Sequence, residues 1–352
     1  MSFKMAIIGM GGMAGWHVSN IREYIPDIAI VGGYDVREEA NTKARDEWGI
    51  KVYMSPEEIY ADSNIDIVLI ATTNDAHKDY SIKCMQAGKH VICEKPVAMD
   101  APELEEILAV AKKTGKLFSV HQNRRWDKDY LTVRKILADG LLNNLHSIES
   151  RVHGSRPLYG WRLFKQNGGG LLLDWGIHLL DQLIDLIPGK VISVQAHLHK
   201  VHGQEVDDSF TVLLRFENGV SGMVSISTTC YIPLPRWHVS CEDGTAVIDD
   251  WELGGKIVKQ ADPNEPDWTE NLLYTAAGPT RIMLPRPKDT TIEVSLPEIV
   301  GTHWTDYYKN IVDTLNGKAE LIVTGEQALR VMKVIDAVFE SDRTGAAITT
   351  GI

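Results

Sequence analysis

Short apolar runs alternate with helical patterns over the first 140 residues, and this alternation constrains the fold more than any other feature of the sequence. An apolar run of about four to eight residues suits a buried strand, and apolar residues recurring every three or four positions suit an amphipathic helix. Strands and helices that alternate in this way predict a parallel sheet with helices on both faces. The predicted strands are Met5–Gly9, Ala29–Tyr34, Ile65–Ala71, His90–Cys93 and Leu117–Val120.

Two of the intervening helices have recognisable start signals. Ser55 and Glu58 have the spacing of a capping box, with a proline at the first helical position between them. Asp100 and Glu103 repeat this spacing for a second helix. That helix is expected to run to Thr114, where a glycine stops it.

The first predicted strand ends in a glycine-rich turn, Gly9-x-Gly11-x-x-Ala14, which opens a helical pattern. The first glycine allows a tight turn, the second lets the backbone approach a pyrophosphate, and the alanine permits close packing of helix on strand. Asp35 ends the next strand roughly 20 residues later, where a carboxylate can bind the 2′-hydroxyl of a ribose. A glycine turn without a ligand is the alternative. The continuing alternation of strands and helices favours a dinucleotide site that also includes Gly12 and Met13.

The pattern changes after about residue 145. One long helical pattern, Leu171–Leu186, precedes alternating runs separated by turn signals, which predict an antiparallel sheet. We expect residues 252 to 300 to form an irregular excursion and Glu326–Ser341 to form a closing helix. The predicted strands of this half are Ser193–His199, Phe210–Phe216, Ser221–Thr229, His238–Cys241 and Thr245–Asp249.

Composition excludes several classes of protein. The formal charge of −12, without a polybasic run, argues against a nucleic-acid partner. No apolar stretch approaches the ~18 residues of a membrane span, and the N-terminus lacks the apolar region of a signal peptide. The four cysteines show no C-x-x-C spacing and are interpreted as reduced thiols. We therefore expect a soluble, cytoplasmic protein.

Several motifs in a fixed order resemble those of the Gfo/Idh/MocA oxidoreductases, the relatives of glucose–fructose oxidoreductase and inositol dehydrogenase. They are the glycine turn, ATTNDAH (71–77), CEKPVA (93–98), GGGLLLDWGIHLLD (168–181) and VDDSFTVLLRFENG (206–219). The resemblance implies an α/β protein with an N-terminal Rossmann domain and a C-terminal α/β domain that has a large, open, mostly antiparallel sheet. It also implies nicotinamide-linked oxidation or reduction of a hydroxyl or carbonyl on a sugar, glycoside or cyclitol.

The chain is long enough for two domains. We expect a dinucleotide-binding domain at residues 1–125 and a substrate-binding and oligomerisation domain at residues 126–352. The C-terminal helix of the second domain could pack back on the first.

Three residues are the predicted catalytic groups. Asp174 and His178 are spaced i, i+4 and so share a helix face, where a carboxylate and an imidazole can position a proton near neutral pH. The alternative is a pair that only stabilises the helix. Lys95 follows a predicted strand at the edge where parallel sheets bind ligands, and its ammonium can stabilise a developing alkoxide. Without the family motif this lysine would be interpreted as a solvated surface charge.

The resemblance extends the site to further residues. It implies that the ATTNDAH segment lies near the nicotinamide ribose, although Asn74 could instead cap a helix. Residues of the HQNRRWD segment (121–127) would line the cleft, with Arg125 as a possible structural ion-pair partner. The predicted cofactor residues, besides the glycine turn and Asp35, are Arg37, Thr72, Asn74, His77, Glu94 and Lys95; the predicted substrate residues are Asn123, Arg124, His153, Trp161, Arg162, Asp174 and His178.

The remaining expectations concern cofactor, metal, backbone and assembly. Asp35 favours NAD, and Arg37 leaves NADP possible. We expect no metal, because the histidines of HLHKVH (197–202) suit a polar sheet edge. The bond before Pro96 is predicted to be cis. An uncovered face of the second sheet predicts a homodimer or homotetramer. An NAD-assisted glycoside hydrolase or lyase and a non-catalytic nucleotide sensor are the alternative functions.

Overall fold

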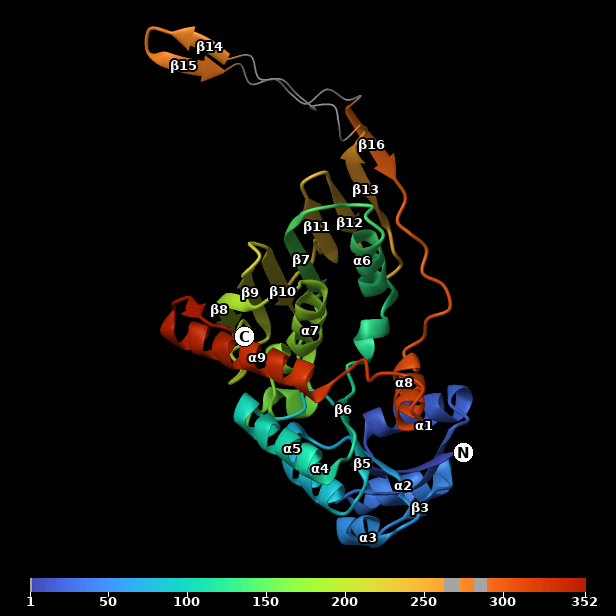
Figure 1. Cartoon of the computed structure of the whole chain (residues 1–352). Helices are drawn as coiled ribbons and strands as arrows, with labels where there is room; N and C mark the ends of the chain where they lie inside the picture. Colours follow the sequence, from blue (N-terminus) through green and yellow to red (C-terminus); the bar gives the residue numbers. More distant parts are fainter. Residues whose placement is uncertain (1, 263–271, 282–289) are drawn as a thin grey trace.

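Figure 1 shows the computed structural model of the chain, which describes residues 2–262, 272–281 and 290–352. The N-terminal part contains a six-stranded sheet in the order β3-β2-β1-β4-β5-β6, and every neighbouring pair is parallel. This confirms the predicted Rossmann-type sheet. Its strands are β1 (Phe3–Ile8), β2 (Ile28–Tyr34), β3 (Lys51–Val52), β4 (Ile67–Ile70), β5 (His90–Cys93) and β6 (Phe118–Val120).

The helices between these strands begin and end largely where their sequence signals lie. Asp100 accepts a hydrogen bond from the backbone N–H of Glu103, as a capping aspartate should. Ser55 precedes its helix but forms no such bond, because Glu58 binds the backbone N–H of Met54 instead. The helices are α1 (Gly12–Tyr24), α2 (Glu38–Trp48), α3 (Pro56–Ala61), α4 (His77–Gln86) and α5 (Ala101–Thr114).

The C-terminal part contains a nine-stranded sheet in the order β16-β13-β12-β11-β7-β10-β9-β8-β17. All its neighbouring pairs are antiparallel except β7 and β10, so the predicted mostly antiparallel sheet is confirmed. Its strands are β7 (Leu145–His153), β8 (Val191–His199), β9 (Ser209–Phe216), β10 (Ser221–Ser227), β11 (Trp237–Cys241), β12 (Gly244–Ile248), β13 (Gly255–Gln260), β16 (Thr291–Val294) and β17 (Ile348–Thr349).

Helices cover one face of this sheet. In Figure 1 the helices α6 (Lys128–Ala138), α7 (Ile177–Leu186) and α9 (Gly325–Thr344) lie on the same side of the strands. Side chains alternate accordingly, since Val212 and Leu214 of β9 are fully buried while Leu213 between them is 46% exposed. Among the described residues, the sheet therefore has one face packed on helices and one face without a helix.

The expected irregular excursion at residues 252 to 300 is wrong in part. Strands β13 and β16 lie inside it and extend the large sheet at one edge. The described residues 272–281 form a separate two-stranded sheet of β14 (Leu272–Thr275) and β15 (Gly278–Arg281). The remainder of the excursion around this hairpin, residues 263–271 and 282–289, lies outside the described residues. Helix α8 (Asp306–Leu315) was also not expected from the sequence.

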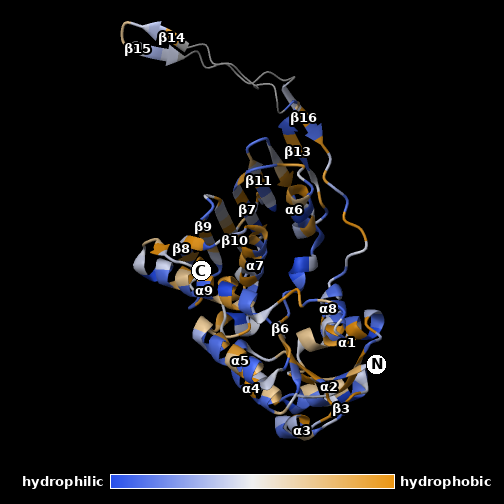
Figure 2. Cartoon of the chain, viewed as in Figure 1, coloured by the Kyte–Doolittle hydropathy of each residue, from blue (hydrophilic) through white to orange (hydrophobic). Residues whose placement is uncertain are grey.

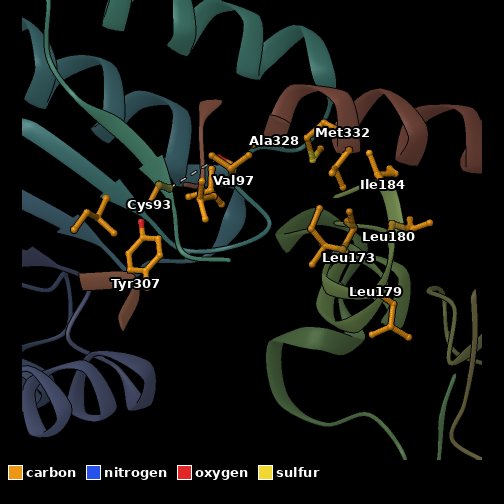
Figure 3. Close-up of a cluster of buried hydrophobic side chains, with 14 of the residues drawn as sticks. Cys93, Val97, Leu173, Leu179, Leu180, Ile184, Tyr307, Ala328 and Met332 are labelled. Carbon is orange, nitrogen blue, oxygen red and sulfur yellow. Dashed lines mark hydrogen bonds between the residues drawn. The ribbon is translucent and has the colours of Figure 1, made fainter. Parts of the chain in front are cut away.

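The chain crosses back to the first domain near its end. Helix α8 contributes Tyr307 and Tyr308 to the core near β5, and Figure 3 shows Tyr307 beside Cys93. Helix α9 then packs Ala328 and Met332 against the leucines of α7, as the same figure shows. Its Asp336 also accepts a hydrogen bond from the backbone of α5. These two helices connect the Rossmann sheet and the large sheet.

A buried ion pair strengthens this connection. Arg125, which follows β6, makes two hydrogen bonds to Asp181 of α7 at 2.7 and 2.8 Å. The same guanidinium donates to Gln327 of α9 and to the carbonyl of Ile322. Arg125 is therefore the structural ion-pair partner that the sequence allowed.

The surface has a mixed polarity. Figure 2 shows that helices such as α5 and α9 carry both polar and apolar residues, which fits helices with one buried side. No helix within the described ranges is long and apolar enough to cross a membrane. All four cysteines are free thiols, as predicted.

Candidate active site

The glycine turn leaves open space at the start of α1. Gly9 has a φ of +92°, and a Cβ placed there would lie 2.6 Å from the carbonyl carbon of Ala71. A side chain at this position would therefore collide with the end of β4. A Cβ on Gly12 would meet no heavy atom within 4 Å, and Gly11 and Gly12 line a cavity at this helix start, where the first backbone N–H groups have no partner within the helix. This is the geometry in which a helix N-terminus accepts a phosphate group.

A cavity of about 760 Å³ extends from this turn across the carboxyl ends of the Rossmann strands. Its size lies within the range of small-molecule and cofactor sites. It joins the first domain to the segment before α7. The residues that line it include Gly9, Gly11, Gly12, Met13, Asp35, Arg37, Thr72, Asn74, Glu94, Lys95, Trp161, Arg162 and Asp174. Ala14 is fully buried against the sheet.

Asp35 lies at one end of the cavity and is almost completely buried. Its carboxylate accepts hydrogen bonds from the backbone N–H of Met10 at 2.8 Å and from the guanidinium of Arg37 at 3.0 and 3.1 Å. Burial raises the pKa of Asp35, but the bonds from Arg37 outweigh it and hold the pKa below its usual value. The side chain of Arg37 is 60% exposed, so this guanidinium can leave Asp35 without unfolding anything.

Lys95 and Asp174 meet at the other end of the cavity. The ammonium of Lys95 donates to Asp174 Oδ1 at 2.9 Å and to the backbone carbonyl of Asp174 at 2.6 Å. Arg162 donates to the second carboxylate oxygen at 2.7 Å. Burial raises the pKa of Asp174, but the two cations overcome this effect and keep it below its usual value. The peptide bond between Lys95 and Pro96 is cis, as predicted.

His178 is buried beside this ion pair. Its Nδ1 lies 2.8 Å from the amide oxygen of Gln122, which can only accept a hydrogen bond. The proton is therefore on Nδ1, and Nε2 keeps its lone pair. Burial, together with the charges of Lys95 and Arg124, holds the pKa of His178 well below its usual value. This histidine is a neutral imidazole that can accept a proton.

The helix that carries Asp174 and His178 differs from the prediction. Residues Leu172–Gly176 form a π-helical turn, and only Ile177–Leu186 is a regular α-helix. The predicted helical pattern Leu171–Leu186 is therefore corrected in its first turn, which is π-helical. Asp174 bonds to Lys95 and Arg162, whereas His178 bonds to Gln122.

The residues of the ATTNDAH segment have different environments. Thr72 and Asn74 line the cavity, and the amide of Asn74 also donates to the carbonyl of Gly168 at 2.9 Å. His77 is fully buried and outside the cavity lining. Its ring nitrogens lie 2.8 Å from the carbonyl of Pro96 and 3.2 Å from that of Thr72. His77 therefore holds two cavity loops together and does not face the cavity itself.

The predicted substrate residues are also divided. Arg124 binds Asp127 and lies 4.2 Å above the ring of Trp175, next to His178. Asn123 begins the short helical turn before Arg124 and does not line the 760 Å³ cavity. His153 lies at the end of β7, where it contacts Ser225 on the open face of the large sheet. His153 is thus separated from the other predicted substrate residues.

Two residues near His178 were not predicted. Gln122 orients the imidazole, and its place at the end of β6, directly before Asn123, is a signal that could have identified it. Trp251 lies in the turn after β12, with its ring 6.2 Å from that of Trp175. Nothing in the local sequence around Trp251 indicates this proximity.

One group of described side chains has the composition of a metal site. His17, Glu94 and His121 are buried, and one ligand atom of each lies within 4.8 Å of the others. Both imidazoles approach the same oxygen of Glu94, at 2.7 and 2.8 Å. Ligand atoms around zinc at about 2.0–2.1 Å in a tetrahedron would be roughly 3.3 Å apart. The observed spacing is that of hydrogen bonds.

Both halves of the chain match a family of known proteins. Residues 3–122 match the family described as "Oxidoreductase family, NAD-binding Rossmann fold", and residues 130–247 match the "GFO/IDH/MocA C-terminal domain". The chain is 27% identical to the scyllo-inositol 2-dehydrogenase (NADP(+)) of Bacillus subtilis, over 94% of this chain and 93% of that protein. It is 28% identical to the myo-inositol 2-dehydrogenase of Thermotoga maritima, over 64% of this chain and 68% of that protein. The solved structure of an NAD-binding protein from Listeria innocua is similar to this chain with a TM-score of 0.87 and 39% sequence identity. The match covers 99% of this chain and 97% of that one.

Asp207 provides a test of how the segment with Asp174 is held. Its buried carboxylate accepts a hydrogen bond from the backbone N–H of Leu172 at 2.7 Å, at the start of the π turn. Burial raises the pKa of Asp207 to about 6. The folded protein therefore keeps a proton that the unfolded chain releases near pH 4, and this contribution to stability is lost as the pH rises toward 6. Relative to Asp207→Asn, the native protein should lose up to about 3 kcal/mol of unfolding free energy between pH 4 and pH 7.

Denaturant titrations of both proteins across this pH range measure that difference. Asp208→Asn is the matched control, because hydrogen bonds from the His202 and Val201 backbone and from the His202 ring outweigh burial and lower the pKa of Asp208. Its native carboxylate should therefore gain stability over the variant as the pH rises. A stability difference for Asp207 that does not change with pH would contradict the assignment.

Proposed function

The chain belongs to the Gfo/Idh/MocA family of NAD-binding oxidoreductases, and we propose that it transfers a hydride between a nicotinamide cofactor and a hydroxyl or carbonyl group of a sugar, glycoside or cyclitol. One observation carries this proposal. Lys95 and Asp174 line the cavity that begins at the glycine turn and bond to each other, and the neutral imidazole of His178 is buried four residues after Asp174, outside the cavity lining. The similarity to two inositol 2-dehydrogenases supports a polyol substrate.

The residues of the cavity fit a dinucleotide. The open start of α1 suits the pyrophosphate, and Asp35 suits a ribose hydroxyl. The remaining cofactor residues proposed here are Gly9, Gly11, Gly12, Met13, Arg37, Thr72, Asn74, Glu94 and Lys95, while His77 and Ala14 shape the surrounding loops. A bound nicotinamide supplies the hydride acceptor or donor.

Side chains of the protein accept the hydroxyl proton of the substrate and stabilise the charge on its oxygen. In the direction of oxidation, Nε2 of His178 accepts the proton of the substrate hydroxyl. Lys95 donates a hydrogen bond to the same oxygen and stabilises the negative charge that develops on it. Asp174 fixes the position of Lys95 through the 2.9 Å contact and can bind a neighbouring hydroxyl of the substrate. We expect the rest of the substrate to contact Trp161 and Arg162, which line the cavity, and Arg124, which lies outside this lining over the ring of Trp175.

The roles of His178 and Lys95 can be separated by substitution. We expect His178→Ala to lower kcat by about 10²–10⁴-fold, because a general base is removed, with little change in the affinity for NAD. Lys95→Ala should lower kcat and also raise KM. A panel of sugars, glycosides and cyclitols assayed for nicotinamide reduction identifies the substrate first. His197→Ala, on the exposed side of β8, is the control and should leave both constants unchanged.

Three outcomes would contradict parts of this proposal. Near-normal turnover of His178→Ala would assign the base to another group. Product formed from a glycoside without net change of NAD would favour the hydrolase or lyase alternative. Binding of NAD without turnover of any panel member would favour a sensor, although a sensor has no need of the three gathered catalytic groups.

The contacts of Asp35 predict a preference for NAD over NADP. A buried carboxylate repels a 2′-phosphate, so kcat/KM should be at least about ten-fold higher with NAD. Asp35→Ser should narrow or reverse this ratio, because it releases the guanidinium of Arg37 to bind the phosphate. The double variant Asp35→Ser/Arg37→Ala should lose that gain. Comparable efficiency of the native enzyme with both cofactors would refute the prediction.

The open face of the large sheet supports a homodimer or homotetramer. Leu213 of β9 and Met223 of β10 are register partners on this face, and Leu213 is 46% exposed in the middle of the sheet. An apolar patch in this position is typical of an association surface. Light scattering at micromolar concentration should show a dimer or tetramer, and Leu213→Glu should shift it toward the monomer. Met54→Glu, at an exposed site of the first domain, should not. A monomeric native protein would overturn the prediction.

A further inference from the structure

A buried carboxylate lies directly behind Lys95. Glu94 follows the last residue of β5 and is only 5% exposed, yet it is among the residues that line the cavity. One of its oxygens accepts hydrogen bonds from Nε2 of His17 at 2.7 Å and Nδ1 of His121 at 2.8 Å. The other oxygen accepts from the backbone N–H of Lys95 at 3.1 Å. Three N–H groups therefore solvate this carboxylate in place of water.

The neighbours of Glu94 fix its charge. Tyr308 lies 2.7 Å from Nδ1 of His17, and burial raises the pKa of this phenol well above its usual value. The phenol therefore donates to Nδ1, and His17 donates its single ring proton from Nε2 to Glu94. Nε2 of His121 is buried and has no hydrogen-bond partner among the described residues. A proton there would be a buried donor without an acceptor. The whole cluster thus carries the single negative charge of Glu94.

This charge completes the balance at one end of the cavity. Lys95 and Arg162 both bind Asp174, so two cations share one carboxylate. Without Glu94 this end would have an excess of one positive charge. Asp35, the other carboxylate of the cavity lining, lies at the opposite end beside the glycine turn. Glu94 therefore brings this end of the cavity to a net charge of zero, so that a cation bound next to Lys95 meets no excess of positive charge.

We propose that Glu94 makes this site favour the oxidised, cationic form of the nicotinamide, so that the bound cofactor is a stronger reductant and the chain works mainly as a carbonyl reductase. This inference rests on the proposed function. In the reduction, the hydride leaves C4 of the dihydronicotinamide with both electrons of its C–H bond and forms a new C–H bond at the carbonyl carbon. By the reverse of the oxidation step, the carbonyl oxygen takes a proton from Nε2 of His178, which must first gain that proton from solvent because the resting ring is neutral. The positive charge appears on the nicotinamide ring, where Glu94 stabilises it.

Equilibrium binding measures this effect without turnover. Dissociation constants for NAD and NADH, obtained by calorimetry on the whole chain, give the ratio of the two affinities. Glu94→Gln should raise the Kd for NAD about ten-fold more than the Kd for NADH. For a two-electron couple this change corresponds to about 30 mV in the potential of the bound cofactor. Asp35→Asn is the matched control and should weaken both forms equally, because the adenosine ribose is the same in each.

A purely structural role predicts a different result. Loss of packing around Glu94 would weaken NAD and NADH by the same factor, and an unchanged ratio in folded Glu94→Gln overturns the proposal. Lys95→Met tests the same charge balance if Glu94→Gln fails to fold. Because this variant removes a cation, it should strengthen the binding of NAD relative to that of NADH. An unchanged ratio of the two dissociation constants, or a relative gain for NADH, overturns the proposal. A native chain that binds neither form would instead overturn the proposed function, and this inference with it.

Discussion

The contact between Lys95 and Asp174 is the interaction on which the site depends, because it joins two separately folded layers. Lys95 follows a strand of the Rossmann sheet, and Asp174 lies in the π turn that precedes α7 over the large sheet. Neither residue can form the site alone. The ammonium touches both the side chain and the backbone carbonyl of Asp174, which fixes its distance and its direction. Any change in the placement of one domain on the other would move this pair first.

The rest of the connection keeps that placement. Helix α9 packs on α7 and bonds to α5, and Arg125 ties β6 to α7 through Asp181. A buried, bidentate ion pair of this kind is costly to break, since either partner left alone would be an unpaired buried charge. Helix α8 adds Tyr308, which reaches His17 at the far side of Glu94. Helices α8 and α9, near the end of the chain, thus contact both the Glu94 side and the α7 side of the active site.

The sequence predicts the Rossmann half well because local signals determine it. The strand His90–Cys93 is found with its predicted bounds, and the capping contact of Asp100 forms as expected. The second half depends more on contacts that are distant in sequence. Strand β13 has the sequence GKIVKQ, and its two lysines make it hard to predict as a strand. It lies near the edge of the sheet, where such charges are tolerated. The start of the π turn is bound by Asp207, whose carboxylate accepts a hydrogen bond from the N–H of Leu172, 35 residues away. Gln122 lies in the HQNRRWD segment, so its place beside His178 could have been inferred, whereas only the folded chain brings Trp251 to Trp175.

Buried groups of the same chemical type differ in pKa and in role because their hydrogen-bond and charge partners differ. Asp174 and Asp207 are both buried, but two cations outweigh burial at Asp174 and lower its pKa. No cation is paired with Asp207 within the described part of the chain, and burial raises its pKa to about 6. His178 and His17 both lose the charged form to burial. His178 is oriented by an acceptor and keeps Nε2 available, whereas both nitrogens of His17 are engaged. A histidine that can act as a base therefore has one ring nitrogen without a hydrogen-bond partner, whereas in a structural histidine both ring nitrogens are bonded. A search for catalytic histidines by residue type would find both, and the hydrogen-bond partners decide between them.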